Sequence, residues 1–142
     1  MKRILAATDG SDGAERAVEL AAELAHALDG SLLILTVTDD LSGSAVNALA
    51  RSERDLGEAV DLLVNQILNH ARTCAARAGA TRIETLSGWG DPTQSIIDFA
   101  RRYHADAIVV GRRGRGQLSG LLLGSVSQKL VTLAPCPVIV VP

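Results

Sequence analysis

The sequence predicts an α/β fold, namely a doubly wound parallel sheet of five strands in the order 3-2-1-4-5 with helices on both faces. The main observation is that short apolar runs alternate with stretches of helical spacing from one end of the chain to the other. No low-complexity tract or internal repeat interrupts this alternation. A length of 142 residues fits one domain with a sizeable core, so residues 1–142 are expected to form a single domain.

The N-terminal part predicts a strand, a helix and a second strand. Apolar runs place the two strands at Arg3–Thr8 and Ser31–Thr38. Between them, Ser11 or Asp12 can cap a helix, and Gly30 ends it. The apolar residues of this helix recur at helical spacing, at Ala14, Ala17, Val18, Ala21, Leu24, Ala25 and Leu28.

One long helix dominates the middle of the chain. It is expected from about Ser52 to the stop at Gly79, and its apolar stripe includes Cys74. A loop with one or two helical turns, at residues 44–49, is expected before it. After it, Thr81–Leu86 alternates polar and apolar residues, which is typical of a half-exposed strand at the edge of a sheet.

Asp91 and Pro92 mark the start of a third long helix. Asp91 can cap it and Pro92 suits its first position, and the apolar pattern runs to Tyr103. The residues before it, including Gly88 and Trp89, are expected to form a loop in which the indole packs on a neighbour.

Two further strands are expected in the C-terminal part, at Ala107–Val110 and Pro137–Val141. Between them lies a loop rich in Gly and Arg, followed by a helix that starts at Gly124-Ser125. The apolar stripe of this last helix consists of Val126, Leu130 and Leu133.

The composition excludes several classes of function. Hydrophobic residues make up 47% and charged residues 21%, with a net charge of −2, so nucleic acid is not expected as a partner. Aromatic residues make up only 2%, which disfavours base stacking and a flavin carrier. No signal peptide or membrane-spanning run is found, which predicts a cytoplasmic protein without a membrane partner. Cys74 and Cys136 are expected to be reduced, and His26, His70 and His104 to be isolated residues rather than ligands.

The strand order places a ligand site at one end of the sheet. Ligands of open α/β sheets bind where the strand order reverses, beyond the carboxyl ends of strands one and four. These strands end at Thr8-Asp9 and Val110-Gly111. Close backbone approach at glycine and the amides of a first helical turn can hold an anion, and Ser125 and Ser127 add hydroxyl groups. Three arginines supply positive charge nearby, namely Arg112, Arg113 and Arg115.

At this point the residues resemble those of a known family. Gly111, Gly114, Gly124 and Ser125 fit G-x2-G-x9-G-[ST], which is similar to the nucleotide-binding signature of the universal stress protein family. The similarity extends along the chain through ATDGS, GDP, VVG, LGSVS and APCPVIVV. The sequence therefore resembles the ATP-binding branch of that family, although Ala7 stands where better-known ATP-binding members have proline.

The resemblance implies a site for ATP with Mg²⁺, the ion being held through the phosphates with Asp9 as a candidate ligand. Asp9 would face the ribose and phosphates, and the backbone of Val37 would meet the adenine edge. Gly111 and Gly114 would pass under the ribose and phosphates. The candidate nucleotide-binding residues are Ala7, Thr8, Asp9, Val37, Gly111, Arg112, Gly114, Gly124, Ser125, Val126 and Ser127.

The implied function is that of a nucleotide-dependent stress sensor or regulator, with no catalytic residue assigned. One alternative is a weak ATP hydrolase, but the sequence has no G-x4-G-K-[ST] loop and no His or carboxylate pair at the crevice. Another is a structural dimer that binds no nucleotide. A receiver-type domain is disfavoured because Gly88 stands where a phosphate-accepting Asp is needed. For Asp9 there are two equal hypotheses: it faces the ligand, or it is a turn residue that accepts backbone hydrogen bonds.

The last strand predicts a homodimer. In the expected order it lies at an edge of the sheet, and a bare apolar edge invites pairing with another chain. A second copy related by two-fold symmetry would cover it, and the family resemblance points the same way. The residues of this edge are Val138, Ile139, Val140 and Val141.

Overall fold

The computed structural model describes residues 3–38, 53–112 and 124–142. Its five strands form one parallel sheet in the order β3-β2-β1-β4-β5, which confirms the predicted fold. The strands are β1 (Arg3–Ala7), β2 (Ser31–Thr38), β3 (Ile83–Trp89), β4 (Ala107–Gly111) and β5 (Val138–Val141). The helices are α1 (Asp12–Ala27), α3 (Glu53–Arg77), α4 (Pro92–Arg102) and α5 (Ser125–Leu133).

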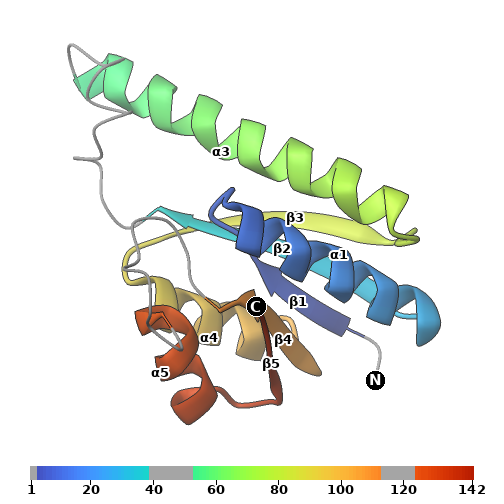
Figure 1. Cartoon of the computed structure of the whole chain (residues 1–142). Helices are drawn as coiled ribbons and strands as arrows, with labels where there is room; N and C mark the ends of the chain where they lie inside the picture. The colour runs from blue at the N-terminus through green and yellow to red at the C-terminus, as the bar shows by residue number, and fades with distance from the viewer. Residues whose placement is uncertain (1–2, 39–52, 113–123) are drawn as a thin grey trace.

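The helices cover the two faces of the sheet in pairs. Helices α1 and α3 lie on one face, and α4 and α5 lie on the other (Figure 1). Because successive side chains of a strand point to opposite faces, each central strand contributes to both cores. In β1, Ile4 and Ala6 pack in the core beneath α1 and α3, whereas Leu5 packs in the core beneath α4 and α5.

Small side chains bring α1 close to the sheet. The buried face of this helix consists mainly of alanine, so its backbone approaches β1 and β4 closely. The helix begins after Ser11, whose hydroxyl oxygen accepts a hydrogen bond from the amide of Ala14 at 3.3 Å. The capping side chain and the alanine stripe together fix where the start of α1 meets the end of β1.

Strand β3 is longer and lies further along the chain than the sequence predicts. The prediction of Thr81–Leu86, with Gly88 and Trp89 in a loop, is wrong because the ladder with β2 continues through Gly88 to Trp89. An added Cβ at Gly88 would lie 2.6 Å from the Ser95 hydroxyl and 2.9 Å from the Phe99 ring, so α4 packs directly on this strand backbone. Glycine here serves close packing of a helix on the strand rather than a turn.

Two packing expectations also differ from the structure. Trp89 is 60% exposed at the end of β3, so most of the indole that was predicted to pack on a neighbour faces solvent. Leu133 is 57% exposed, so the apolar stripe of α5 consists of Val126 and Leu130 without it. The helical turns predicted at 44–49 and the Gly/Arg loop at 113–123 lie outside the described residues. None of the described helices combines the length and the apolar character needed to cross a membrane.

Candidate functional site

A cleft of about 410 Å³ opens beyond the carboxyl ends of β1, β2 and β4. Here β1 and β4 are neighbours although they are far apart in the chain, which is the arrangement at which α/β sheets bind ligands. The cleft is lined by ten of the eleven predicted residues, namely Ala7, Thr8, Asp9, Val37, Gly111, Arg112, Gly124, Ser125, Val126 and Ser127. The eleventh, Gly114, lies outside the described residues.

Six further residues of the cleft wall were not predicted from the sequence: Ser11, Ala14, Leu35, Pro92, Ile96 and Val110. Leu35, Ile96 and Val110 are buried members of the core beneath α4 and α5, so the core itself forms the floor of the cleft. Pro92 and Ile96 belong to the start of α4. The sequence predicts the start of that helix at Asp91 and Pro92. It does not predict that β3 continues to Trp89, and this longer strand is what brings the start of α4 to the cleft.

The backbone of Val37 points into the cleft. The carbonyl of Leu35 accepts a hydrogen bond from the amide of Thr8 at 2.9 Å, so the polar backbone groups of Leu35 face β1. Backbone direction alternates along a strand, and Val37 therefore faces the same side two residues later. Because β1 ends at Ala7, an amide and a carbonyl of β2 are directed at the space beyond it.

Three helices begin around the cleft, and their N-termini differ. Ser11 caps α1, and the Asp91 carboxylate accepts a hydrogen bond from the amide of Gln94 at 2.9 Å to cap α4. Helix α5 has Gly124 at its N-cap and no side-chain cap bond. The amides of the first turn of a helix have no partners within the helix, and here no capping side chain competes for them. The start of α5 is thus the end most open to an anion.

Arg112 is held by its backbone between β5 and α5. Its amide donates to the Val141 carbonyl at 2.6 Å, and its carbonyl accepts from the Gly124 amide and the Ser127 hydroxyl, each at 2.7 Å. Its Nε atom is buried and has no hydrogen-bond partner among the described residues. Arg112 also lines the cleft beside the uncapped start of α5, and a guanidinium at such a place is suited to an anionic ligand.

Gly111 has a packing role that the sequence analysis did not predict. An added Cβ would lie 3.0 Å from the carbonyl carbon and oxygen of Gly13 and 3.2 Å from the amide nitrogen of Ala14. The missing side chain therefore lets β4 pack against the first turn of α1. Gly111 still lines the cleft through its backbone.

Asp9 and Thr8 form the turn between β1 and α1. One carboxylate oxygen of Asp9 accepts a hydrogen bond from the Ser11 amide at 2.9 Å, and the Thr8 hydroxyl accepts one from the Gly10 amide at 3.1 Å. Gly10 adopts a positive φ of 83°, which favours glycine. The alternative in which Asp9 accepts a backbone hydrogen bond in a turn is therefore present in the structure, and Asp9 also lines the cleft.

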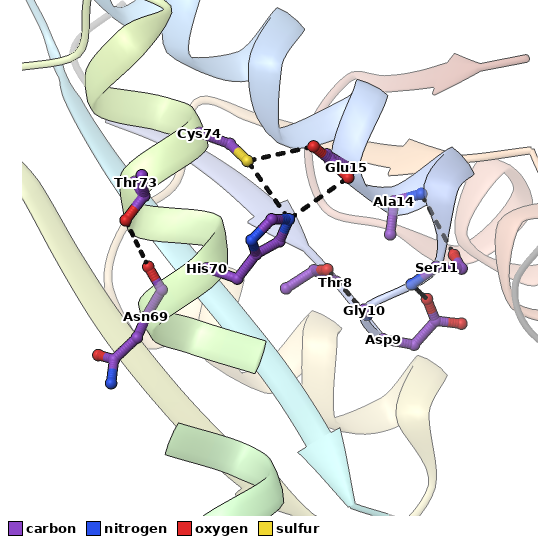
Figure 2. Close-up of polar contacts among 10 residues, drawn as sticks. All are labelled: Thr8, Asp9, Gly10, Ser11, Ala14, Glu15, Asn69, His70, Thr73 and Cys74. Carbon is purple, nitrogen blue, oxygen red and sulfur yellow. Dashed lines mark hydrogen bonds and ion pairs between the residues drawn. The ribbon is translucent and has the colours of Figure 1, made fainter. Parts of the chain in front are cut away.

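A second group of polar side chains lies between α1 and α3. Cys74 and Glu15 are in contact, and the His70 ring lies beside both, so the prediction that His70 is isolated is wrong (Figure 2). Hydrogen bonds from Cys74 and His70 lower the pKa of the Glu15 carboxyl. Burial, and next the neighbouring Glu15, raise the pKa of the Cys74 thiol. Both cysteines are free, and burial also raises the pKa of Cys136.

Comparison with known proteins identifies the family. The model of the universal stress protein family matches residues 1–142. The chain belongs to the universal stress protein family. A curated relative from Thermus aquaticus, the universal stress protein in the QAH/OAS sulfhydrylase 3′ region, is 35% identical over 140 residues, which are 99% of this chain and 98% of the relative.

Solved universal stress proteins share the fold and include nucleotide complexes. The crystal structure of a universal stress protein in complex with cAMP superposes with a TM-score of 0.76 at 31% identity, covering 99% of this chain and 97% of that one. The universal stress protein from Archaeoglobus fulgidus in complex with dAMP superposes with a TM-score of 0.70 at 28% identity, covering 100% and 98%. Adenine nucleotides are therefore ligands of at least two structural relatives of this universal stress protein.

Proposed function

We propose that this universal stress protein binds ATP with Mg²⁺ in the cleft and acts as a nucleotide-dependent sensor or regulator. The observation that carries the proposal is the start of α5, whose glycine cap leaves the first-turn amides facing the cleft without a competing side chain. The relatives that hold cAMP and dAMP support an adenine nucleotide as the ligand class.

The adenine is expected over the apolar part of the cleft. Leu35, Ile96 and Val110 offer a flat apolar floor that a planar base can cover. The backbone of Val37 offers one donor and one acceptor at the rim, a pair that matches the neighbouring acceptor and amino group of adenine. This arrangement would select adenine without any charged side chain.

The phosphates are expected at the opposite end of the cleft. The amides of Ser125, Val126 and Ser127 would donate to phosphate oxygens, and the guanidinium of Arg112 would add a charge-assisted hydrogen bond. The Ser127 hydroxyl donates to backbone carbonyls and so holds α5 to Arg112. Asp9 is the carboxylate in the cleft wall and would help to hold Mg²⁺, an ion that supplies positive charge between the phosphate groups when bound.

Binding, rather than hydrolysis, is what the described residues support. Among the described residues that line the cleft, Asp9 is the single carboxylate and no histidine is present. Asp9 is therefore the one lining side chain of a type that commonly acts as a general base for water. Nucleotide binding would instead favour one arrangement of the surface around the cleft over another. A weak hydrolase remains the alternative that the turnover assay below distinguishes.

Three further expectations belong to the same proposal. The chain would form one domain, because all described strands belong to one sheet. It would pair with a second copy through the β5 edge, because every residue of β5 is apolar and only partly covered. It would act in the cytoplasm, where both thiols would stay reduced.

Calorimetric titration tests the proposal with Gly124→Val. The backbone of Gly124 has φ −74° and ψ 168°, which valine can adopt without backbone strain. Its side chain would block the approach of phosphate to the first turn of α5, and measurable ATP binding should disappear. Gly57→Ala is the matched control, because a Cβ at Gly57 meets nothing within 4 Å. Unchanged ATP affinity in Gly124→Val would overturn the proposal, and steady release of phosphate by the unmodified chain would establish a hydrolase.

A further inference from the structure

A cluster of three potential metal ligands lies between α1 and α3, outside the cleft wall. His70 and Cys74 are four residues apart on α3 and therefore lie on the same face of that helix. Glu15 comes from the first turn of α1 and points at both of them (Figure 2). The three side chains join two helices, with Glu15 and Cys74 separated by 59 residues in the chain.

The distances between the ligand atoms suit one small metal ion. The Cys74 Sγ lies 3.3 Å from Glu15 Oε1 and 3.6 Å from His70 Nε2, and His70 Nε2 lies 3.4 Å from Glu15 Oε2. A tetrahedral zinc ion with bonds of about 2.3 Å to sulfur and about 2.0–2.2 Å to nitrogen and oxygen separates its ligands by roughly 3.4–3.6 Å. The three groups stand close to those separations, with one Glu15 oxygen facing Cys74 and the other facing His70. One ligand atom from each of the three residues lies within 4.8 Å of the other two.

The types of ligand select among metals. A thiolate, an imidazole and a carboxylate are the usual ligands of Zn²⁺, whereas Mg²⁺ and Ca²⁺ prefer oxygen ligands alone. Two negative ligands, Glu15 and the Cys74 thiolate, balance the charge of the ion. Two charges outside the cluster act on the pKa of the Cys74 thiol in opposite directions. Glu19 of α1 raises this pKa, and Arg77 of α3 lowers it.

The burial pattern leaves one side of the cluster open. The Cys74 side is buried, while the side chains of His70 and Glu15 are 62% and 37% exposed. An ion held by three protein ligands at such a boundary keeps a fourth position for water or another external ligand. The cluster therefore resembles zinc sites with an open coordination position rather than structural sites in which four protein ligands enclose the ion.

We propose that Glu15, His70 and Cys74 form a zinc-binding site that fastens the first turn of α1 to α3. On binding, the Cys74 thiol proton passes to solvent and the sulfur forms the bond to zinc. Glu15 follows Ala14 directly, and Ala14 lines the cleft, so the ion would restrain the helix turn that forms one wall of it. Zinc binding does not depend on the proposed ATP site, because none of its three ligands lines the cleft.

Cobalt is the probe for the test, because tetrahedral Co²⁺ bound to a thiolate absorbs strongly. The full chain, stripped of metal and free of nucleotide, is titrated with Co²⁺ and then with Zn²⁺ as competitor. We expect a thiolate-to-cobalt charge-transfer band with one ion per chain, its displacement by Zn²⁺, and a rise in Tm of several degrees in excess Zn²⁺.

Matched variants assign the band to these residues. Cys74→Ser should abolish it, and His70→Gln and Glu15→Gln should each weaken zinc binding at least tenfold. Cys136→Ser and His26→Gln, which change the other cysteine and an exposed histidine of α1, should leave both readouts unchanged. His70 is largely exposed, so its variant will fold even if Cys74→Ser does not. Absence of a band, or a band that survives in His70→Gln and Glu15→Gln, would show a hydrogen-bonded cluster without a metal site and would overturn the proposal.

Discussion

At the scale of single residues, Arg112 combines a structural and a proposed binding role. Its backbone ties the end of β4 to β5 and to α5, and the residue also lines the cleft. Its Nε is buried without a hydrogen-bond partner among the described residues, and such a donor costs about 1–3 kcal/mol. The proposed function adds a contact between the guanidinium of Arg112 and a phosphate oxygen.

Replacing Arg112 with methionine tests this role. Arg112→Met keeps the length of the side chain and removes the guanidinium, so ATP affinity should fall about ten- to hundredfold, as expected for a charged hydrogen bond of about 1.5–3 kcal/mol. The free energy of unfolding should not decrease, because the variant removes a buried nitrogen that has no hydrogen-bond partner among the described residues. Arg101→Met, at an exposed position of α4, is the control. Equal ATP affinities of the two variants would argue against an Arg112–phosphate contact.

Residue roles could be predicted from the sequence only where they depend on local pattern. The Ser11 and Asp91 caps follow from residue type and position, and the structure confirms both. The sequence offers three arginines for the phosphate and cannot rank them, because the burial of Arg112 Nε depends on packing between β4 and α5. The contact between Glu15 and Cys74 was likewise invisible, since nothing local relates residues on two separate helices.

At the scale of elements, the junction between β4 and α1 determines the shape of the cleft. Gly111 lets the strand approach the backbone of Gly13 and Ala14 closely, and the same first turn of α1 carries the Ser11 cap. Gly111 was predicted to be glycine because of a bound nucleotide. The close packing of β4 on α1 requires glycine at this position even when no nucleotide binds. A Gly pattern in a sequence cannot separate these two causes, because both require the same missing side chain.

Gly111→Ala should therefore destabilise the fold itself. The new Cβ would press on backbone atoms at 3.0 Å, which cannot move without shifting α1, and a loss of about 1–3 kcal/mol in the free energy of unfolding is expected. Gly57→Ala, in α3 with open space around it, should instead stabilise by about 0.5–1 kcal/mol through helix propensity. Urea denaturation of both variants measures the difference. Similar stabilities would show that β4 and α1 tolerate separation.

The boundaries of β3 show where element prediction fails. The alternation of polar and apolar residues ends at Leu86, but the ladder with β2 continues for three residues because α4 covers Gly88. The local sequence around Gly88 predicts a turn, but packing against α4 extends β3 through this glycine. The sequence did predict the edge position of β3, although α3 and α4 contact this strand from the two faces of the sheet.

At the scale of the whole molecule, the alternation of strands and helices was sufficient to predict the sheet order and therefore the place of the cleft. The other edge of that sheet, β5, raises the question of assembly. The carbonyls of Pro137 and Val141 accept hydrogen bonds from Ile108 of β4 and from Arg112 directly after it, so residues at odd positions face β4 and Val140 faces outward. A second copy could pair with that outward side.

Val140→Pro tests the proposed homodimer. Proline removes an outward amide without removing a hydrogen bond to β4, and its φ is tolerated in an edge strand. The unmodified chain should sediment as a dimer, and Val140→Pro should sediment as a folded monomer or dissociate at concentrations at least tenfold higher. Val131→Ser, at an exposed apolar position of α5, controls for a general loss of apolar surface. A monomeric unmodified chain, or a Val140→Pro dimer of equal strength, would contradict pairing through β5.

The most direct measurement of the central claim is a crystal structure of the chain grown with excess ATP and Mg²⁺. We predict adenine over Leu35 and Ile96 and phosphate oxygens within hydrogen-bond distance of the amides that begin α5. A cleft that contains only solvent at saturating nucleotide, or ATP bound elsewhere on the molecule, would contradict it.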